Sequence, residues 1–361
     1  SFWVLTCIYL QLLLSYKILY LKSNDERFSL IGSLFFLTST IFLHRSGIHL
    51  SLMAHWIILL GIYIEISYSN KKNLYRLIIV SLSITIHFYF TLILLFLFFL
   101  NDLIKIIENK NLLLIKLKNL ILLLILSITL MYILGYFSIK LDDGLGWGYG
   151  YYNYNLNSFF NPRGFNNNLN FSWSNFLTTL DYQNGEVEGF SYLGVSGIIF
   201  FILFLINLIN KKYLIFYNSK GWVFLILPFL LISVSNNINF GGINLLYVEL
   251  NKYIYAIASI FRASGRLIWP VYYFIFLVGI IFIFNYSKSK SSLILSILLI
   301  FQLFDIQSGI KNYKMGNQYY ESSQKISSKL WTSLSSQFDN IFLLESKNQS
   351  EIYHKISGYL L

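Results

Sequence analysis

The chain has 361 residues, of which 56% are hydrophobic and only 12% are charged, and its mean hydropathy is +0.60. An average soluble domain is about a quarter charged, so these values exclude an ordinary soluble protein and a disordered chain. The net charge of +11 does not indicate a nucleic-acid partner, because the basic residues are spread between apolar runs. The single cysteine, Cys7, excludes a disulfide framework and a cysteine-based metal site.

Both ends of the chain favour a fragment or a mature form of a larger membrane protein. The sequence begins with Ser1 inside an apolar run that has no basic leader, so residues 1–21 are not predicted to be a signal peptide. The last residues, Gly358 to Leu361, end in the middle of a pattern. We therefore expect the chain to start inside a larger membrane protein and to end before its C-terminal part is complete.

Long apolar stretches indicate an all-α polytopic membrane protein. A membrane-spanning helix needs about 20 apolar residues, and the shorter stretches here suit helices packed in a bundle. The stretches cover residues 1–21, 28–43, 50–68, 77–100, 119–138, 193–210, 221–237, 268–285 and 291–305.

The stretch 77–100 is flanked by basic residues on both sides. Basic loops stay cytoplasmic. A single crossing by 77–100 divides Lys and Arg equally between the two sides, whereas a hairpin places most of them inside. The sequence therefore predicts a re-entrant helical hairpin with its turn near His87, each arm reaching half the membrane thickness. The alternative is one long tilted helix.

This topology divides the chain into a transmembrane bundle, residues 1–305, and an extracytoplasmic tail, residues 306–361. The long loops 139–192 and 238–266 lie on the outer face, and only short basic connectors lie inside. In the tail, the apolar pattern predicts an amphipathic helix from Ser322 to Ser336 and a buried strand from Ile341 to Leu344. We interpret the tail as the start of a small soluble α/β domain.

The first candidate site is the short outer loop that begins at His44 and the helix start after it. Its side chains suit contacts with a substrate or a pyrophosphate: His44, Arg45, His49 and His55. A divalent metal is an alternative that needs a further ligand, because a six-residue spacing between His49 and His55 is poor on a helix. Interfacial anchoring together with Trp56 is the structural alternative.

The second candidate site is the loop 139–192, which is dense in aromatic residues and glycine. Loops this long are usually functional or disordered, and the aromatic content argues against disorder. Tyr and Trp faces beside amides and carboxylates suit a sugar. An aromatic belt on the bilayer surface is the alternative. The candidate sugar- or acceptor-binding residues are Trp147, Tyr149, Asn161, Arg163 and Tyr192.

Glu186 and Glu188 are the candidate catalytic residues of the same loop. Paired carboxylates can perform general acid–base catalysis. Two glutamates spaced two residues apart more often serve structure or solubility, so both interpretations stay open.

The third candidate site is the segment from Phe261 to Pro270. Arg262 and Arg266 are four residues apart, which places them on one face of a helix at the mouth of a span. Guanidinium groups match phosphate oxygens, and a lipid-linked phosphate lies at this height in the bilayer. The alternative is that both arginines extend to lipid headgroups.

The chain resembles a family of bacterial polytopic membrane proteins with a GT-C glycosyltransferase-like architecture. The motifs that carry the resemblance are Arg45…His49…His55-Trp56, His87-Phe88-Tyr89, Phe160-Asn161-Pro162, the run from Glu188 to Gly194 and the run from Arg262 to Pro270. The resemblance implies a multi-pass protein of the bacterial inner (plasma) membrane. It also implies transfer of a sugar from a polyprenyl-phosphate-linked donor to an envelope acceptor at the outer face.

Two other functions remain as alternatives to this glycosyltransferase. One is a lipid-linked saccharide transporter or flippase, although ion-coupled transport usually leaves buried charges in mid-membrane, and this sequence shows none there. The other is a non-catalytic scaffold for envelope assembly. The resemblance places the catalytic carboxylate in an outer loop that precedes this chain, so the sequence assigns no catalytic aspartate.

Overall fold

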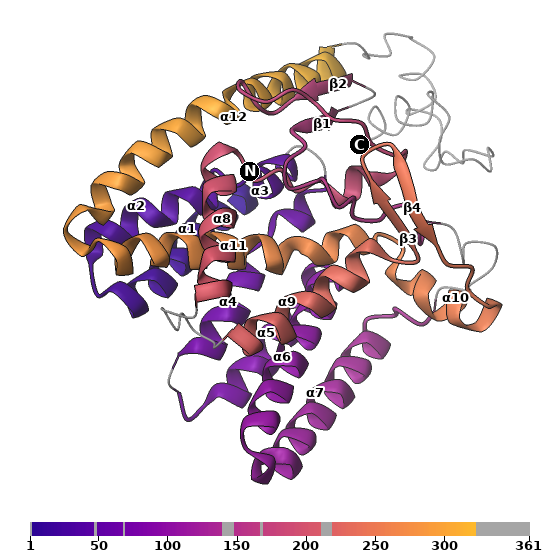
Figure 1. Cartoon of the computed structure of the whole chain (residues 1–361). Coiled ribbons are helices and arrows are strands. Elements are labelled where there is room, and N and C mark those ends of the chain that lie inside the picture. Colours follow the sequence, from indigo (N-terminus) through magenta and orange to yellow (C-terminus); the bar gives the residue numbers. More distant parts are fainter. Residues whose placement is uncertain are drawn as a thin grey trace, which may run out of the picture. The chain divides into compact units, whose positions relative to one another are not determined.

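A computed structural model describes residues 2–46, 49–67, 69–138, 148–166, 169–210 and 219–322 of the chain (Figure 1). Two compact units divide the chain, Ser1–Ile310 and Lys311–Leu361. The first unit contains the features discussed below. The helix and strand predicted within residues 322–344 lie almost wholly outside the described residues.

Helices occupy most of the described chain. The α-helices are α1 (Phe2–Ser23), α2 (Glu26–Leu37), α3 (Thr40–His44), α4 (Trp56–Ile66), α5 (Lys72–Ile86), α6 (Phe88–Glu108), α7 (Leu113–Ile133), α8 (Val195–Asn210), α9 (Ser219–Val234), α10 (Lys252–Ala258), α11 (Trp269–Tyr286) and α12 (Ser291–Ser322). The 3₁₀ helices are η1 (Leu50–Met53), η2 (Lys110–Leu112), η3 (Glu186–Gly189), η4 (Ser259–Phe261), η5 (Ser264–Ile268) and η6 (Lys288–Lys290). Each predicted apolar stretch contains at least part of one helix.

Five helical segments of the described chain are long and apolar enough to cross a membrane: Phe2–Ser23, Phe88–Glu108, Lys110–Ile133, Ser264–Tyr286 and Lys288–Asn312. The predicted helical membrane protein is thus supported. α12 continues past residue 305 from the predicted bundle into the predicted tail.

The prediction of an all-α bundle needs one correction. Two small antiparallel sheets lie in the long loops, one made of β1 (Arg163–Asn166) and β2 (Leu169–Ser172), the other of β3 (Asn237–Phe240) and β4 (Ile243–Tyr247). All five residues of β4 are exposed, and Asn239 is the buried residue of β3, so this second sheet does not extend the apolar core.

The helix α11 forms the centre of the bundle. It is almost entirely buried by protein, whereas α7 exposes most of its apolar side chains. On α7, for example, Leu114, Ile125 and Ile128 are all more than half exposed. An apolar surface of this size on a helix long enough to span a membrane is expected to face lipid. Pro270 lies in the first turn of α11, where its missing N–H costs no hydrogen bond.

A helical hairpin turns at His87, as predicted, and its re-entrant placement in a membrane stays a prediction. The chain leaves the helix for one residue at His87, whose backbone is extended, and α6 starts directly after it. Near this turn Ser83 Oγ lies 2.9 Å from Thr91 Oγ1, and at the other end Arg76 Nη1 donates to Asp102 Oδ2 at 2.7 Å. These contacts align α5 and α6 antiparallel, so the two basic segments that flank the hairpin lie at the same end of it.

The expected half-span length of the hairpin arms is wrong. α5 has 15 residues and α6 has 21, and α6 is itself long enough to cross a membrane. The tip of the hairpin and its base therefore lie at two different levels of the bundle: thirteen residues of α6 separate Tyr89 from Asp102, or about 20 Å along the helix.

A buried ionic cluster closes the base of the hairpin. Arg76 donates to Glu65 Oε1 at 2.6 Å and forms a two-bond pair with Asp102, with distances of 2.7 and 3.0 Å. Lys105 pairs with Glu65 at 3.2 Å and Lys116 with Asp102 at 2.9 Å. This Arg76 cluster ties the adjoining ends of α4, α5, α6 and α7 together.

A second set of contacts closes the start of α8. Asp305 Oδ2 accepts from Val195 N at 2.9 Å, and Gln302 Oε1 accepts from Ser196 N at 3.2 Å. The first amides of a helix have no partner within that helix, and here two side chains of α12 supply one. Tyr192 OH also donates to Asp305, at 2.8 Å. The end of the long loop is thereby fixed against α12.

Candidate functional site at Glu188

Glu188 joins three segments that are far apart in the sequence. Its Oε2 atom accepts from Arg45 Nη2 and from Arg266 Nε, each at 2.9 Å. The side chains of Arg45, Arg266 and Glu188 are 4%, 11% and 15% exposed. The His44–His49 loop, the Glu186–Gly194 segment and the Arg262–Arg266 segment thus meet at one carboxylate. We call these three residues the Glu188 cluster.

Two glycines allow the glutamate and arginine segments to approach. A Cβ atom added to Gly265 would lie 2.7 Å from Gly189 Cα and 2.8 Å from the carbonyl oxygen of Asn153. Real Cβ atoms do not approach backbone this closely, so η3 and η5 pack through bare backbone. The N–H of Gly265 also donates to Tyr152 O at 3.0 Å. The glycines of both motifs thus have a packing reason to be glycine.

Each arginine of the site lies over an aromatic ring. Arg266 stands 4.7 Å from the ring centre of Tyr89, and Arg262 stands 5.3 Å from that of Tyr152. Arg45 lies 5.5 Å from the ring of Trp269. Such contacts favour a guanidinium group over an ammonium group, because the planar cation stacks on the ring face.

The tip of the α5–α6 hairpin supplies one of these rings. Tyr89 OH accepts from the backbone N–H of Ala263 at 2.6 Å, and the ring of His87 lies 5.6 Å from the Tyr89 ring. The Glu188 cluster therefore lies at the tip of the hairpin, and the Arg76 cluster lies at its base.

The sequence predicted that Arg262 and Arg266 share one helical face, but in the structure they do not. Arg262 follows the short η4, Ala263 breaks the helical backbone, and Arg266 belongs to the separate 3₁₀ helix η5. Arg262 is exposed, whereas Arg266 is directed to Glu188.

The charges of the site keep Glu188 ionised. Burial raises the pKa of a carboxyl group, but the cations Arg45 and Arg266 outweigh this effect and hold the pKa of Glu188 well below its usual value. Burial, together with the Arg45 charge, lowers the pKa of His44 from 6.5 to about 3. Burial and the two arginines also lower the pKa of His49, against the opposing effect of Glu188. Both histidines are thus neutral near pH 7.

His49 is the exposed histidine of this site. Its backbone is left-handed, with φ of +59°. Such a conformation is uncommon for a residue with a side chain, although histidine is among the residues that adopt it more often. The strain fits a residue at a functional loop, where such outliers gather.

Glu186 belongs to a different set of contacts from Glu188. Its two oxygens accept from Asn155 Nδ2 at 2.7 Å, from Asn239 Nδ2 at 3.0 Å and from the backbone N–H of Gln183 at 2.8 Å. Burial raises its pKa, and the three donors partly offset this. Glu186 therefore holds the 148–166 loop, β3 and its own turn together, and it does not pair with Glu188.

A small cavity of about 20 Å³ lies beside Glu186. This volume accommodates about one water molecule. Its lining includes the predicted binding residues Asn161 and Arg163. Asn161 stabilises the loop by accepting from Arg163 N at 3.2 Å and from Leu180 N at 3.0 Å, and the Arg163 guanidinium lies 3.9 Å from the Tyr182 ring.

The remaining predicted site residues lie in or near the core. Tyr192 and His55 are completely buried. His55 Nδ1 lies 2.9 Å from Tyr273 OH, and its ring lies 4.4 Å from Trp269, the residue under Arg45. Tyr149 is half-buried, with its ring 6.4 Å from that of Tyr255. Trp147 lies outside the described residues.

Five contributing residues are absent from the sequence-based site prediction: Tyr89, Tyr152, Trp269, Asn155 and Asn239. The hairpin offered a signal for Tyr89, because a hairpin with full-length arms brings its tip to the segments that carry Glu188 and Arg266. No group of three His, Cys, Asp or Glu side chains able to hold a metal ion is found in the described part of the chain.

Comparison with known protein families identifies the family of the chain. Residues 1–307 match a family model that is described as a domain of unknown function, DUF6311. No curated protein and no solved structure matches the chain. Because the match spans most of its length, the chain belongs to the DUF6311 family.

Proposed function

We propose that the protein is a membrane glycosyltransferase of GT-C-like architecture, which binds a polyprenyl-phosphate-linked sugar at the Glu188 cluster and transfers the sugar to an envelope acceptor. The observation that carries the proposal is that Arg45 and Arg266 both contact the carboxylate of Glu188. The exposed Arg262 lies just before the turn that holds Arg266. Their guanidinium groups are pre-oriented by aromatic rings and suit the oxygens of a phosphate.

The proposed role of Glu188 is to orient the arginines. A carboxylate held by two guanidinium groups is a weak base, because its pKa is low. A phosphate that enters the site competes with Glu188 for Arg266, whose contact is the more exposed of the two. The catalytic base is therefore proposed to come from another part of the protein. Glu186, whose oxygens already accept three hydrogen bonds, is proposed to shape the loop.

The proposal also uses the position of the site. The Glu188 cluster and the Arg76 cluster lie at opposite ends of the α5–α6 hairpin. The basic segments 69–76 and 101–118 adjoin the Arg76 cluster, and basic segments are expected in the cytoplasm. The Glu188 cluster is then at the outer face, where a polyprenyl-phosphate-linked donor presents its sugar.

The test is binding of polyprenyl phosphate by the full chain in detergent, with the phosphate-free polyprenol as the comparison ligand. Losing a charge-assisted contact costs roughly 2–5 kcal/mol, so Arg266→Ala should weaken phosphate binding at least about tenfold. Arg266→Lys should weaken it less, because an ammonium keeps the charge but not the paired hydrogen bonds. The matched control is Arg27→Ala, which removes an exposed arginine of α2.

Sugar transfer from a polyprenyl-phosphate-linked donor is measured on the same variants. The proposal expects transfer to fall in parallel with phosphate binding. Wild-type binding in both Arg266 variants would contradict a phosphate role for this arginine. Phosphate-dependent binding without any transfer would instead favour the transporter or scaffold alternatives.

A further inference from the structure

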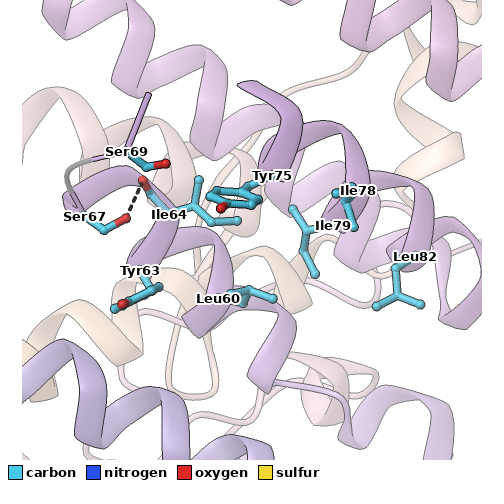
Figure 2. A pocket seen from close by; sticks show the side chains of 9 residues that line it. All are labelled: Leu60, Tyr63, Ile64, Ser67, Ser69, Tyr75, Ile78, Ile79 and Leu82. Carbon is cyan, nitrogen blue, oxygen red and sulfur yellow. Dashed lines mark hydrogen bonds between the residues drawn. The ribbon is translucent and has the colours of Figure 1, made fainter. Parts of the chain in front are cut away.

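An apolar groove of about 480 Å³ lies between α4 and α5, at the end of the hairpin that carries the Arg76 cluster (Figure 2). The groove is lined by Leu60, Tyr63, Ile64, Ser67, Ser69, Tyr75, Ile78, Ile79 and Leu82. Its volume falls within the usual range for small-molecule sites. The proposed glycosyltransferase function does not use it, because Glu188 meets its partners at the opposite end of the hairpin.

The groove is polar at one end and apolar at the other. Ser67 and Ser69 lie at the connection between α4 and α5, whereas Ile78 and Leu82 lie further along α5 (Figure 2). Ile78 and Leu82 are 55% and 42% exposed. In a membrane, such side chains face acyl chains, so the groove is an extension of the lipid phase into the protein.

The residues that line the groove are uncharged, but basic residues lie next to its polar end along the chain. Lys71 is exposed at the start of α5, and its backbone N–H donates to Ser69 Oγ at 3.1 Å. Lys72 Nζ donates to the carbonyl oxygen of Glu65 at 2.8 Å. With the Arg76 cluster included, this end of the hairpin holds five basic side chains, Lys71, Lys72, Arg76, Lys105 and Lys116, and two carboxylates, Glu65 and Asp102.

We propose that the groove binds one anionic phospholipid, with an acyl chain along Ile64, Ile78 and Leu82 and the phosphate near Lys71 and Ser69. The apolar lining matches a hydrocarbon chain, and the basic, hydroxyl-bearing end matches a negatively charged headgroup. An uncharged or zwitterionic lipid would satisfy the apolar part only. The basic end also favours the cytoplasmic leaflet, which carries anionic lipids.

The experiment titrates the full chain in detergent with phosphatidylglycerol or phosphatidylcholine and follows the first bound lipid by native mass spectrometry. Ile78→Trp fills the groove from an exposed position, and we expect roughly a tenfold loss of phosphatidylglycerol affinity. The matched control is Leu74→Trp, which places the same side chain on the same helix at a position that is 50% exposed and does not line the groove.

The headgroup is tested by Lys71→Gln. A basic residue near a membrane surface is worth about 1 kcal/mol toward anionic lipid, so phosphatidylglycerol affinity should fall about fivefold while phosphatidylcholine affinity stays unchanged. Lys118→Gln, an exposed lysine of α7, is the control. Equal affinity for the two lipids in the wild type would overturn the anionic headgroup. Equal effects of the Ile78 and Leu74 variants would overturn the groove as the site. Arg266→Ala should leave lipid binding here unchanged, which separates this proposal from the proposed function.

Discussion

The Oε2 atom of Glu188 is the point at which two arginines from distant segments meet. Glu188→Gln removes this charge and leaves Arg45, which is 4% exposed, without its carboxylate partner. Breaking a buried pair costs roughly 3–5 kcal/mol, and the partial exposure of Glu188 lowers the expected loss to about 2 kcal/mol. Thermal unfolding in detergent measures the loss.

The control for Glu188→Gln is Glu108→Gln at an exposed position near the end of α6, which should change stability by less than about 0.5 kcal/mol. If a phosphate uses the same arginines, polyprenyl phosphate should stabilise Glu188→Gln more than it stabilises the wild type. Wild-type stability in the glutamine variant would show that the cluster contributes nothing to folding.

His44 makes the stability of this region depend on pH. Its pKa is lowered from 6.5 in the unfolded chain to about 3 in the folded chain, so the unfolded state binds the extra proton first as the pH falls. The stabilisation is complete above pH 6.5 and declines between pH 6.5 and about 3. His44→Asn should be less stable at pH 7 but should show a flatter melting-temperature profile between pH 6.5 and 4. A parallel profile would contradict the assignment.

At the scale of elements, η3 and η5 are held together by the contact between Gly189 and Gly265. Gly265→Ala places a Cβ atom 2.7 Å from Gly189 Cα and 2.8 Å from Asn153 O, both of which are backbone atoms. The two turns must separate, and overpacking of this kind typically costs about 1–3 kcal/mol. The melting temperature and polyprenyl phosphate binding should both fall.

The matched variant is Gly242→Ala, where the nearest atom to an added Cβ is the Asp181 side-chain Cβ at 3.3 Å and the glycine is exposed. It should leave both measurements close to wild type. If Gly265→Ala behaves like Gly242→Ala, the close approach of the two turns does not position Arg266.

The elements that the sequence could predict are those fixed by local pattern. The apolar stretches of the sequence predicted where the helices lie. The basic residues on both sides of 77–100 predicted the hairpin and its turn at His87. The second arm of the hairpin is longer than expected. The predicted apolar stretch ends at residue 100, but the helix α6 continues through the polar residues Asn101 and Asp102 to Glu108. Buried polar residues can lie inside a helix when partners such as Arg76 satisfy them.

The parts of the site that could not be predicted depend on contacts between distant segments. Arg262 and Arg266 have helical spacing, but Ala263 breaks the helix between them, and Arg262 ends η4 whereas Arg266 belongs to η5. His55 and Tyr192 carry groups that suit ligand binding, yet Tyr273 and Asp305 satisfy them in the core. No local pattern reveals that Asn155 and Asn239 provide the donors for Glu186.

At the scale of the whole molecule, the hairpin predicts which segments share a side of the membrane. Cysteines introduced at Asn70 and Asn111, both exposed, should be labelled from the same side, in a Cys7→Ser background that removes the buried thiol. A cysteine at the exposed Lys252 of α10, ahead of the Glu188 cluster, should be labelled from the opposite side. Labelling of Asn70 and Asn111 from different sides would contradict the paired arrangement of α5 and α6 in the membrane.

The side chains of Gln302 and Asp305 have a consequence for how the protein is made. They cap the first amides of α8, although about a hundred residues of chain separate the two helices. During translation α8 leaves the ribosome long before α12. The first N–H groups of α8 therefore lack their acceptors from α12 while the intervening segments are inserted. The loop that holds Glu188, which ends at α8, can reach its final position only after residue 305 has left the ribosome. Nascent chains stalled with residue 305 still inside the ribosome should have a 186–194 segment that added protease cleaves, and chains long enough to release residue 305 should be protected there.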